Sequence, residues 1–197
     1  MSIESKLVTI AENNQKVYNK GKTDEWHNFW DNFQDRGDKT DYENAFRKWA
    51  DGCYNPKYPI ITTSGRTRAN SMFNQSSITD TRVDITINSV GTTHVFYNAS
   101  KLKTIRKLTV NKDVTFGSWF VYAHALENIT FDGEIGQNIS FADCKKLTHY
   151  SLMSVINCLK DYSGGQTTHT LTLGTALQAK LSDEEKAIAT EKGWTLA

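Results

Sequence analysis

Three phenylalanines in the middle of the chain each open the same short hydrophobic pattern. Phe96, Phe120 and Phe141 are each followed, in steps of three residues, by a small residue, a leucine and then an isoleucine or tyrosine. The residues at these steps are Ala99, Leu102 and Ile105, then Ala123, Leu126 and Ile129, then Cys144, Leu147 and Tyr150. An earlier copy opens at Phe73, so that successive copies begin 23, 24 and 21 residues apart. The pattern is therefore an internal repeat.

Between these copies lie short runs in which apolar and polar residues alternate, a pattern typical of half-buried strands. The apolar positions of these runs are Val83, Ile85 and Ile87, then Leu108 and Val110, then Ile129 and Phe131. A unit of just over twenty residues with one short strand cannot bury a core alone, so successive units must stack. We therefore expect an α+β fold built on a short solenoid, with Phe73, Phe96, Phe120 and Phe141 stacked in register inside it.

The C-terminal part of the chain predicts a cap for such a stack. Ser151 can open a helix that runs to about Leu159, and the alternating stretch THTLTLG reads as the last strand. Ser182 followed by Glu185 is a capping box, which predicts a final helix. We expect Trp194 and Leu196 to fold back as a lid.

The N-terminal segment shows helical rather than alternating periodicity. Its first stripe has one polar core position and consists of Ile3, Leu7, Ile10, Asn14 and Val17. A heptad seam with a buried asparagine is typical of parallel coiled coils, but the same spacing is the ordinary stripe of a helix packed on its own domain. Two further aromatic stripes, 26–33 and 42–49, predict short helices, and 51–59 predicts an irregular connector. We thus divide the chain into a helical attachment or oligomerisation segment with its connector, 1–60, and a solenoid with a C-terminal helix cap, 61–197.

Composition and charge exclude several classes of protein. Lys plus Arg number 23 against 22 Asp plus Glu, so the net charge of +1 recruits neither nucleic acid nor an anionic membrane. No stretch is apolar enough to insert into a membrane, and the first residues show no export signal. Three cysteines without ligand spacing favour reduced thiols, and Cys144 fits its repeat position as a compact apolar residue rather than a reactive group.

The repeat resembles the BspA-like leucine-rich repeat family, whose units carry Phe, Cys or Ala, Leu and Ile at these steps. FADCKKLTHY is the best-matching segment, and the resemblance covers about residues 70–152. The flanking segments AENNQKVYNKGKTDEWHNFWDNFQ and LSDEEKAIATEKGWTLA are similar to those beside such repeats in phage and prophage proteins of gut Gram-positive bacteria. The resemblance implies a right-handed solenoid that serves for binding or as a structural part, without catalysis.

Motifs of catalysis and of metal or cofactor binding are missing from the sequence. There is no Walker loop, HExxH, GxSxG or GxGxxG, and the five histidines are scattered. His27 and Asp31 are the one helical pair with ligand spacing, which is more often a solvated face than a metal site. We therefore expect no catalytic residue, no metal site and no cofactor.

One local charge feature remains. Five basic residues occur within twelve positions with no acid between them: Lys101, Lys103, Arg106, Lys107 and Lys112. This basic cluster is a candidate contact for an anionic glycopolymer or an acidic protein patch. Alternatively, it is a solvated edge that resists edge-to-edge association of sheets.

These observations favour a non-enzymatic phage virion protein, such as a tail or head appendage, that attaches through its N-terminal helices and exposes its repeats for host attachment or particle stabilisation. The expected partners are other virion proteins, a host cell-surface glycopolymer or protein, and further copies of the chain in a homo-oligomer. The protein would be made in the host cytoplasm and carried in the virion. The alternative is a bacterial surface adhesin or a protein-interaction module of the same repeat family.

Overall fold

The structure, a computed structural model, describes residues 43, 45–54, 56, 59–62, 69–165 and 168–197. The chain divides into two compact units, Met1–Arg36 and Gly37–Ala197, and all the described residues belong to the second. The expected N-terminal seam from Ile3 to Val17, the aromatic stripe 26–33 and the pair of His27 with Asp31 lie outside the described residues.

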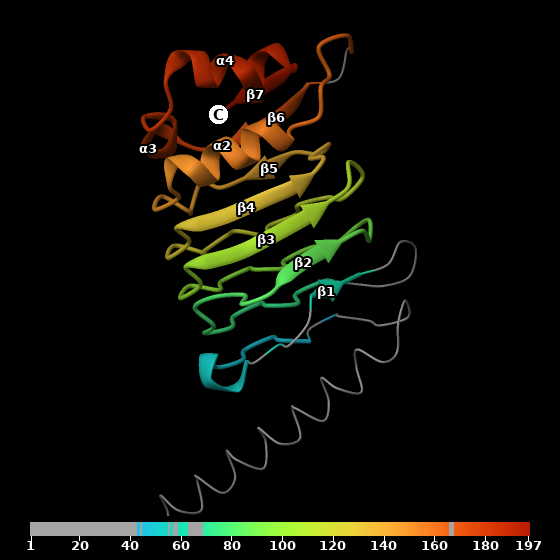
Figure 1. Cartoon of the computed structure of the whole chain (residues 1–197), viewed down its shortest axis with the longest axis vertical. Coiled ribbons are helices and arrows are strands. Elements are labelled where there is room, and N and C mark those ends of the chain that lie inside the picture. The colour runs from blue at the N-terminus through green and yellow to red at the C-terminus, as the bar shows by residue number, and fades with distance from the viewer. Residues whose placement is uncertain (1–42, 44, 55, 57–58, 63–68, 166–167) are drawn as a thin grey trace, which may run out of the picture. The chain divides into compact units, whose positions relative to one another are not determined.

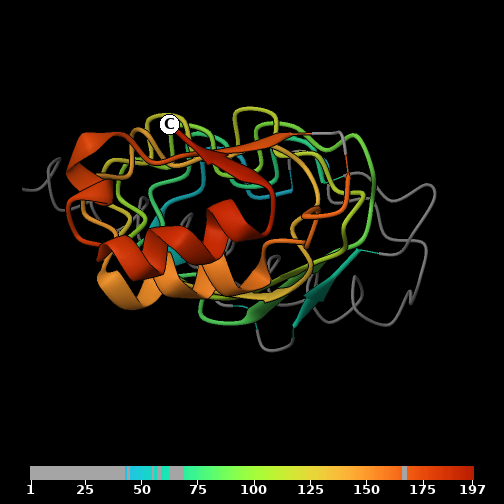
Figure 2. The ribbon, with the colours of Figure 1, turned by 90° about the horizontal axis from the view of Figure 1, so that it is seen from above.

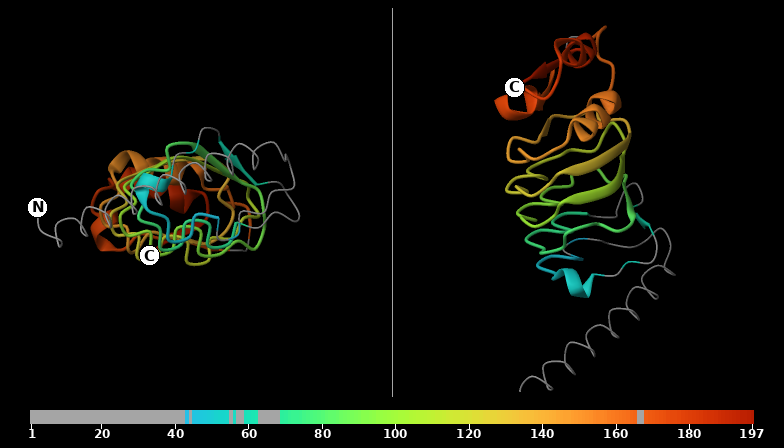
Figure 3. Two further views of the ribbon diagram at one scale, coloured as in Figure 1. Left: turned by 90° about the horizontal axis from the view of Figure 1, so that it is seen from below. Right: turned by 60° about the vertical axis from the view of Figure 1, so that its left-hand side comes forward.

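Four strands form a parallel sheet in chain order: β1 (Ile60–Ile61), β2 (Asp84–Ile87), β3 (Thr104–Val110) and β4 (Asn128–Gly133). The paired positions, such as Ile85 with Leu108, lie one repeat apart in the sequence. Apolar side chains of β2, β3 and β4 point inward and polar ones outward, as the alternation predicts. Figure 3 shows β2, β3 and β4 as successive rungs. The three strands expected from the alternating runs are confirmed.

A second backbone ladder joins the turns that carry the phenylalanines. The backbone N–H of Phe73 donates to the carbonyl of Val95 at 2.7 Å, and the backbone N–H of Phe96 donates to the carbonyl of Trp119 at 3.1 Å. The rings of Phe73, Phe96, Phe120 and Phe141 are buried and stacked, with successive centroids 5.3, 5.7 and 4.6 Å apart. The predicted in-register stack of these four residues is confirmed.

The stack begins one unit earlier than the sequence pattern indicates. The backbone N–H of Phe46 donates to the carbonyl of Met72 at 2.7 Å, and the ring centroids of Phe46 and Phe73 lie 4.9 Å apart. Trp49 stands three residues after Phe46, where the later units carry a small residue. Its backbone N–H donates to the carbonyl of Phe46, as the N–H groups of those small residues donate to the phenylalanines of their own units. Residues 45–48 form turns, so the helix expected over 42–49 is wrong. The compact unit that contains these turns, Gly37–Ala197, extends to both sides of residue 60. Bonds to the next unit outweigh the weak helix propensity of so short a segment.

The C-terminal elements include α2 (His149–Cys158), a helix expected to begin at Ser151. Its N-cap is instead Thr148, whose hydroxyl accepts from the Ser151 amide at 3.3 Å. The Ser151 hydroxyl is buried and accepts from the backbone N–H of Ile129 at 2.9 Å, so it joins the helix to β4. The helix is confirmed, while its predicted cap is wrong by three residues.

A second parallel sheet follows, in the order β5 (Ile139–Ser140), β6 (His169–Thr172), β7 (Trp194–Leu196). The residues expected to form a lid are therefore a strand, because β7 pairs with β6 instead of covering it. Two helices lie between β6 and β7: α3 (Thr175–Gln178) and α4 (Asp183–Glu191). The predicted capping box of α4 is confirmed. Figures 1 and 2 show α2 and α4 side by side.

The described part of the chain is therefore a mixed α/β fold with parallel strands and few helices. Of the helices it contains, none combines the length and the apolar character that crossing a membrane requires.

Candidate functional site

The basic cluster spans β3 and its flanks. Lys101 and Lys103 precede the strand, Arg106 and Lys107 lie within it, and Lys112 follows it. Four of the five side chains are exposed, and Lys107 is half-buried. The structure thus places the cluster along one rung of the sheet and its flanking turns.

Three of these cations have acidic partners. The Lys107 ammonium lies 3.0 Å from the Asp132 carboxylate, and Arg106 lies 3.8 Å from Asp84. Asp84 belongs to β2 and Asp132 to β4, the two strands that flank β3. The ammonium of the third, Lys112, pairs with its sequence neighbour Asp113 at 2.8 Å. Within the ranges that the structure describes, Lys101 and Lys103 have no ion-pair partner.

The pair of Lys107 and Asp132 stabilises the charged form of both groups. The hydrogen bond from Lys107 holds the pKa of Asp132 below its usual value, and the backbone N–H of Gly133 adds to this effect. The same bond to Asp132 raises the pKa of Lys107. Thr109 also donates its hydroxyl to Asp132, at 3.2 Å. A group held as one half of an ion pair is poorly placed to exchange protons with a substrate near neutral pH.

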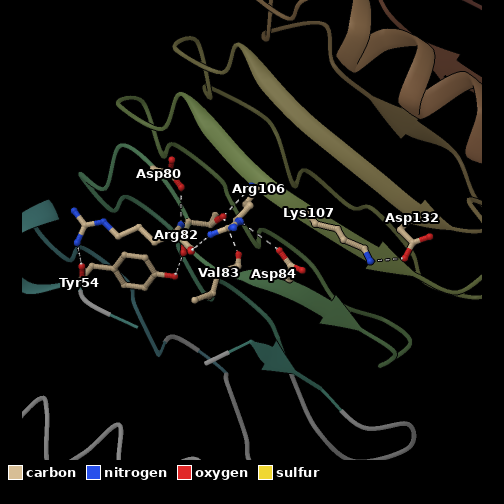
Figure 4. A network of polar contacts seen from close by, with 9 residues as sticks. Tyr54, Asp80, Arg82, Val83, Asp84, Arg106, Lys107 and Asp132 are labelled. Atoms are coloured by element: carbon tan, nitrogen blue, oxygen red, sulfur yellow. Dashed lines mark hydrogen bonds and ion pairs between the residues drawn. The ribbon is translucent and has the colours of Figure 1, made fainter. Parts of the chain in front are cut away.

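A polar network beside the cluster joins the first described unit to the next (Figure 4). Arg82 has a left-handed backbone with φ of 58°, and its amide donates to the Asp80 carboxylate at 2.6 Å. Its guanidinium donates to the carbonyl of Tyr54 and forms an ion pair with Asp51 at 3.2 Å. Asp51 also accepts from the backbone N–H of Thr79 at 2.9 Å. The arginine therefore connects the turn after Trp49 to the approach of β2.

Tyr54 completes this network from inside the fold. Its ring is buried, and its hydroxyl donates to the carbonyl of Thr81 at 2.8 Å. Burial raises the pKa of Tyr54, so the phenol stays neutral. Arg106 carries the network into β3 by donating to the carbonyl of Arg82 at 3.1 Å (Figure 4). These contacts hold three successive units together, which is a structural task.

Four aromatic rings form a second surface feature, which the sequence interpretation missed. His94, Tyr97, Tyr122 and His124 come from two successive units, and neighbouring ring centroids lie 5.1, 5.5 and 6.0 Å apart. Tyr122 and His124 are exposed, and the other two are half-buried. We call these four residues the aromatic stripe. The signal available in the sequence was the appearance of His94 where Ser71 and Ser118 stand in the flanking units, and of Tyr122 where Gln75 and Asn98 stand in earlier units.

The Cys144 thiol is buried within the stack. Its sulfur lies 3.6 Å from the carbonyl of Phe120, and burial raises the pKa of the thiol to about 12. A thiol this far from ionisation is not a nucleophile near neutral pH. In the parts of the chain that the structure describes, no group of three acidic, histidine or cysteine residues is placed to hold a metal ion.

Comparison of the chain with protein-family models, with curated proteins and with solved structures gives no match in any of the three.

Proposed function

We propose that this chain is a non-enzymatic structural or appendage protein of a phage virion. Its repeats would form a right-handed solenoid of the leucine-rich-repeat type that is exposed for host-surface binding or for stabilising the particle. The observation that carries the proposal is the continuous stack of phenylalanine rings, because a stack of this kind makes a rigid scaffold whose outer positions can vary independently of its core.

The solenoid part of the proposal is supported by the connection between strands. Each unit adds one strand in parallel to the one before it, and the intervening chain returns through the phenylalanine turn. Crossovers between parallel strands of one sheet are right-handed in nearly all proteins. A right-handed coil of units agrees with the family that the Phe, small, Leu and Ile pattern resembles.

The non-enzymatic part is supported by the physical causes of the shifted pKa values. Burial is the main cause of the raised pKa values of Tyr54 and Cys144, and a surface ion pair is the main cause of the shifted pKa values of Lys107 and Asp132. The pKa of Glu185 is lowered by the capping box of α4 and by His149. Active sites shift pKa values where charged groups converge on a cleft, whereas these shifts follow from packing, capping and pairing between units.

Within the basic cluster, fewer than five residues are available for the proposed contact with an anionic host polymer. Since Arg106, Lys107 and Lys112 are paired with carboxylates, an anionic glycopolymer would have to displace those partners to bind them. Lys101 and Lys103 are exposed and could bind an anion without that competition. The proposed anionic contact therefore centres on these two lysines.

Attachment through the N-terminal seam can be tested apart from the repeats. Leu7→Asp should convert a homo-oligomer into a folded monomer, because a charge within the seam opposes helix association. Asn14→Ile should tighten association and broaden its stoichiometry. Light scattering on both variants measures the outcome. A parent protein that is already monomeric at tens of micromolar would contradict oligomerisation through this seam.

The virion assignment is tested by the protein content of purified particles. Particles induced from the strain that encodes the chain are banded on a density gradient, and peptides of the chain are quantified against the major structural proteins by mass spectrometry. We expect a constant copy number across the particle fractions. Recovery of the chain on the cell envelope and not in particles would contradict the proposal and assign it to a surface adhesin.

A further inference from the structure

Two residues of the aromatic stripe, His94 and Tyr122, occupy positions at which other units carry small or amide side chains. Hydrogen bonds between units show which positions are equivalent. The backbone N–H groups of Ser71 and His94 each donate to a carbonyl of the following unit, and those of Gln75 and Asn98 do the same. Counted from the phenylalanine of each unit, His94 stands where Ser71 and Ser118 stand. Tyr122 stands where Gln75 and Asn98 stand. The fold therefore does not need a ring at either position.

The backbone at the second of these positions disfavours a tyrosine ring. Ser71, His94 and Ser118 have φ values of 56°, 58° and 54°, and Gln75, Asn98 and Tyr122 have values of 57°, 52° and 60°. Asparagine and histidine are both enriched in this left-handed conformation, so the backbone tolerates His94, whereas the bulky ring of Tyr122 in it is an outlier. Strain of this kind, kept where a better residue stands in neighbouring units, marks a position with a role beyond folding.

The chemistry around the rings combines flat apolar faces with hydrogen-bonding groups. The Asp143 carboxylate accepts from the Tyr122 amide at 2.8 Å, and His124 Nδ1 lies 3.2 Å from the carbonyl oxygen of Asp143. Phenol, imidazole and carboxylate groups thus stand beside ring faces. A sugar presents the matching surface, since its C–H face packs on an aromatic ring while its hydroxyls donate to and accept from neighbouring polar groups.

The size and surroundings of the stripe favour a narrow ligand. A stable protein interface buries about 800 Å² on each partner around an apolar core. The stripe is a single line of four rings, two of them half-buried, and Ser100 and Ser118 beside it are exposed polar residues. It therefore fits a chain-like ligand better than a globular one.

We propose that His94, Tyr97, Tyr122 and His124, together with Asp143, form a binding site for an oligosaccharide chain. The sugar faces would pack on the tyrosine rings, and the hydroxyls would bond to the imidazoles and to the Asp143 carboxylate. The inference rests on the proposed host-surface role and names the ligand class and the residues for it. It differs from the anionic contact at Lys101 and Lys103, because the recognition here is by rings and not by cations.

The neighbouring units supply variants that should remove binding without harming the fold. His94→Ser and Tyr122→Asn place at each position a residue that the same backbone already carries in another unit. We expect the double variant to melt at or above the temperature of the parent, because Tyr122→Asn relieves left-handed strain and the backbone already carries serine at the His94 position in two other units. Tyr150→Ala is the matched control, since it removes an exposed tyrosine outside the stripe.

The test uses the full chain on an array of bacterial and plant oligosaccharides, followed by calorimetry with the best-binding tetrasaccharide on the array. We expect the parent and Tyr150→Ala to bind equally and the double variant to bind at least tenfold more weakly. Absence of binding to every oligosaccharide on the array, or undiminished binding by the double variant, would overturn the inference.

A second arm separates a protein ligand from a carbohydrate one. Isolated cell envelopes of the host are treated with periodate, which destroys sugar diols, or with protease, before binding is measured. We expect periodate to abolish stripe-dependent binding and protease to leave it intact, and the reverse would assign the stripe to a protein partner and overturn the inference. Because the copy number in particles is measured independently, the virion proposal can stand or fall without this site.

Discussion

Replacing Phe120 by alanine should remove one ring from inside the phenylalanine stack. The side chain is 2% exposed and lies between Phe96 at 5.7 Å and Phe141 at 4.6 Å, with Trp119 beside it. The units above and below are tied by backbone bonds, so they cannot close over the gap. Truncation should therefore leave a cavity and lower the free energy of unfolding by about 3–5 kcal/mol.

Equilibrium unfolding in urea measures this loss. With a denaturant slope of about 2 kcal/mol per molar, the midpoint should fall by about 1.5–2.5 M. Circular dichroism reports the strands, and the fluorescence of the five tryptophans includes that of Trp119 next to the cavity, so coincident curves show that the units unfold together. Phe120→Leu keeps part of the contact and should lie between the parent and the alanine variant.

Tyr150→Ala is the control, because an exposed tyrosine should change stability by no more than about 0.5 kcal/mol. An alanine variant at Phe120 whose midpoint equals that of the control would refute the stack as a stabilising core. Total stability of such a domain is about 5–15 kcal/mol, so the expected loss is a large fraction of it.

Three further predictions follow from local contacts. Gly136→Ala should destabilise the fold by about 1–3 kcal/mol, because an added Cβ would lie 2.3 Å from the carbonyl oxygen of Lys112, whereas Gly52→Ala meets nothing within 4 Å and should leave the urea midpoint nearly unchanged. In a protein whose other cysteines are replaced, Cys144 should resist a thiol reagent at pH 8 until urea unfolds the chain, and rapid labelling of the native protein would contradict its burial. Since the pKa of Asp132 is lowered in the folded protein, its ion pair should stabilise the fold above the unfolded pKa of about 4, and this stabilisation should be lost as pH falls through the folded pKa. Asp132→Asn should therefore reduce the loss of stability at acid pH, measured by urea titrations at a series of pH values, and an unchanged loss would contradict the pairing.

The repeat could be predicted from the sequence because its core positions are strict. Phe96, Phe120 and Phe141 keep a three-residue step to the small residue and the leucine, and packing against identical neighbours requires that regularity. Phe46 escaped the pattern for two reasons. Trp49 stands where a small residue is expected, and the spacing of Tyr42, Phe46 and Trp49 is also that of a helical stripe.

The surface could not be predicted in the same way, because its contacts join residues of different units. The basic cluster has no acid within its own segment, yet Asp84 and Asp132 face it from the adjacent strands. A charge run in a repeat has to be compared with the segments one unit before and after it. The C-terminal strand β7 was missed because a three-residue strand shows too little alternation to be distinguished from a loop.

Both the proposed scaffold and the proposed binding site of the aromatic stripe depend on the parallel register of the units. The distance between two spin labels, one on β1 and one on β3, tests this register directly. Ile61 and Thr109 face outward on either side of Thr86 in one row, two strand spacings or about 10 Å apart. Both are changed to cysteine and labelled with nitroxides in a chain that carries Cys53→Ser, Cys144→Ala and Cys158→Ser. The account predicts strong dipolar broadening in the doubly labelled protein that disappears in urea. A spectrum equal to the sum of the two singly labelled proteins would contradict the register and the stacked repeat with it.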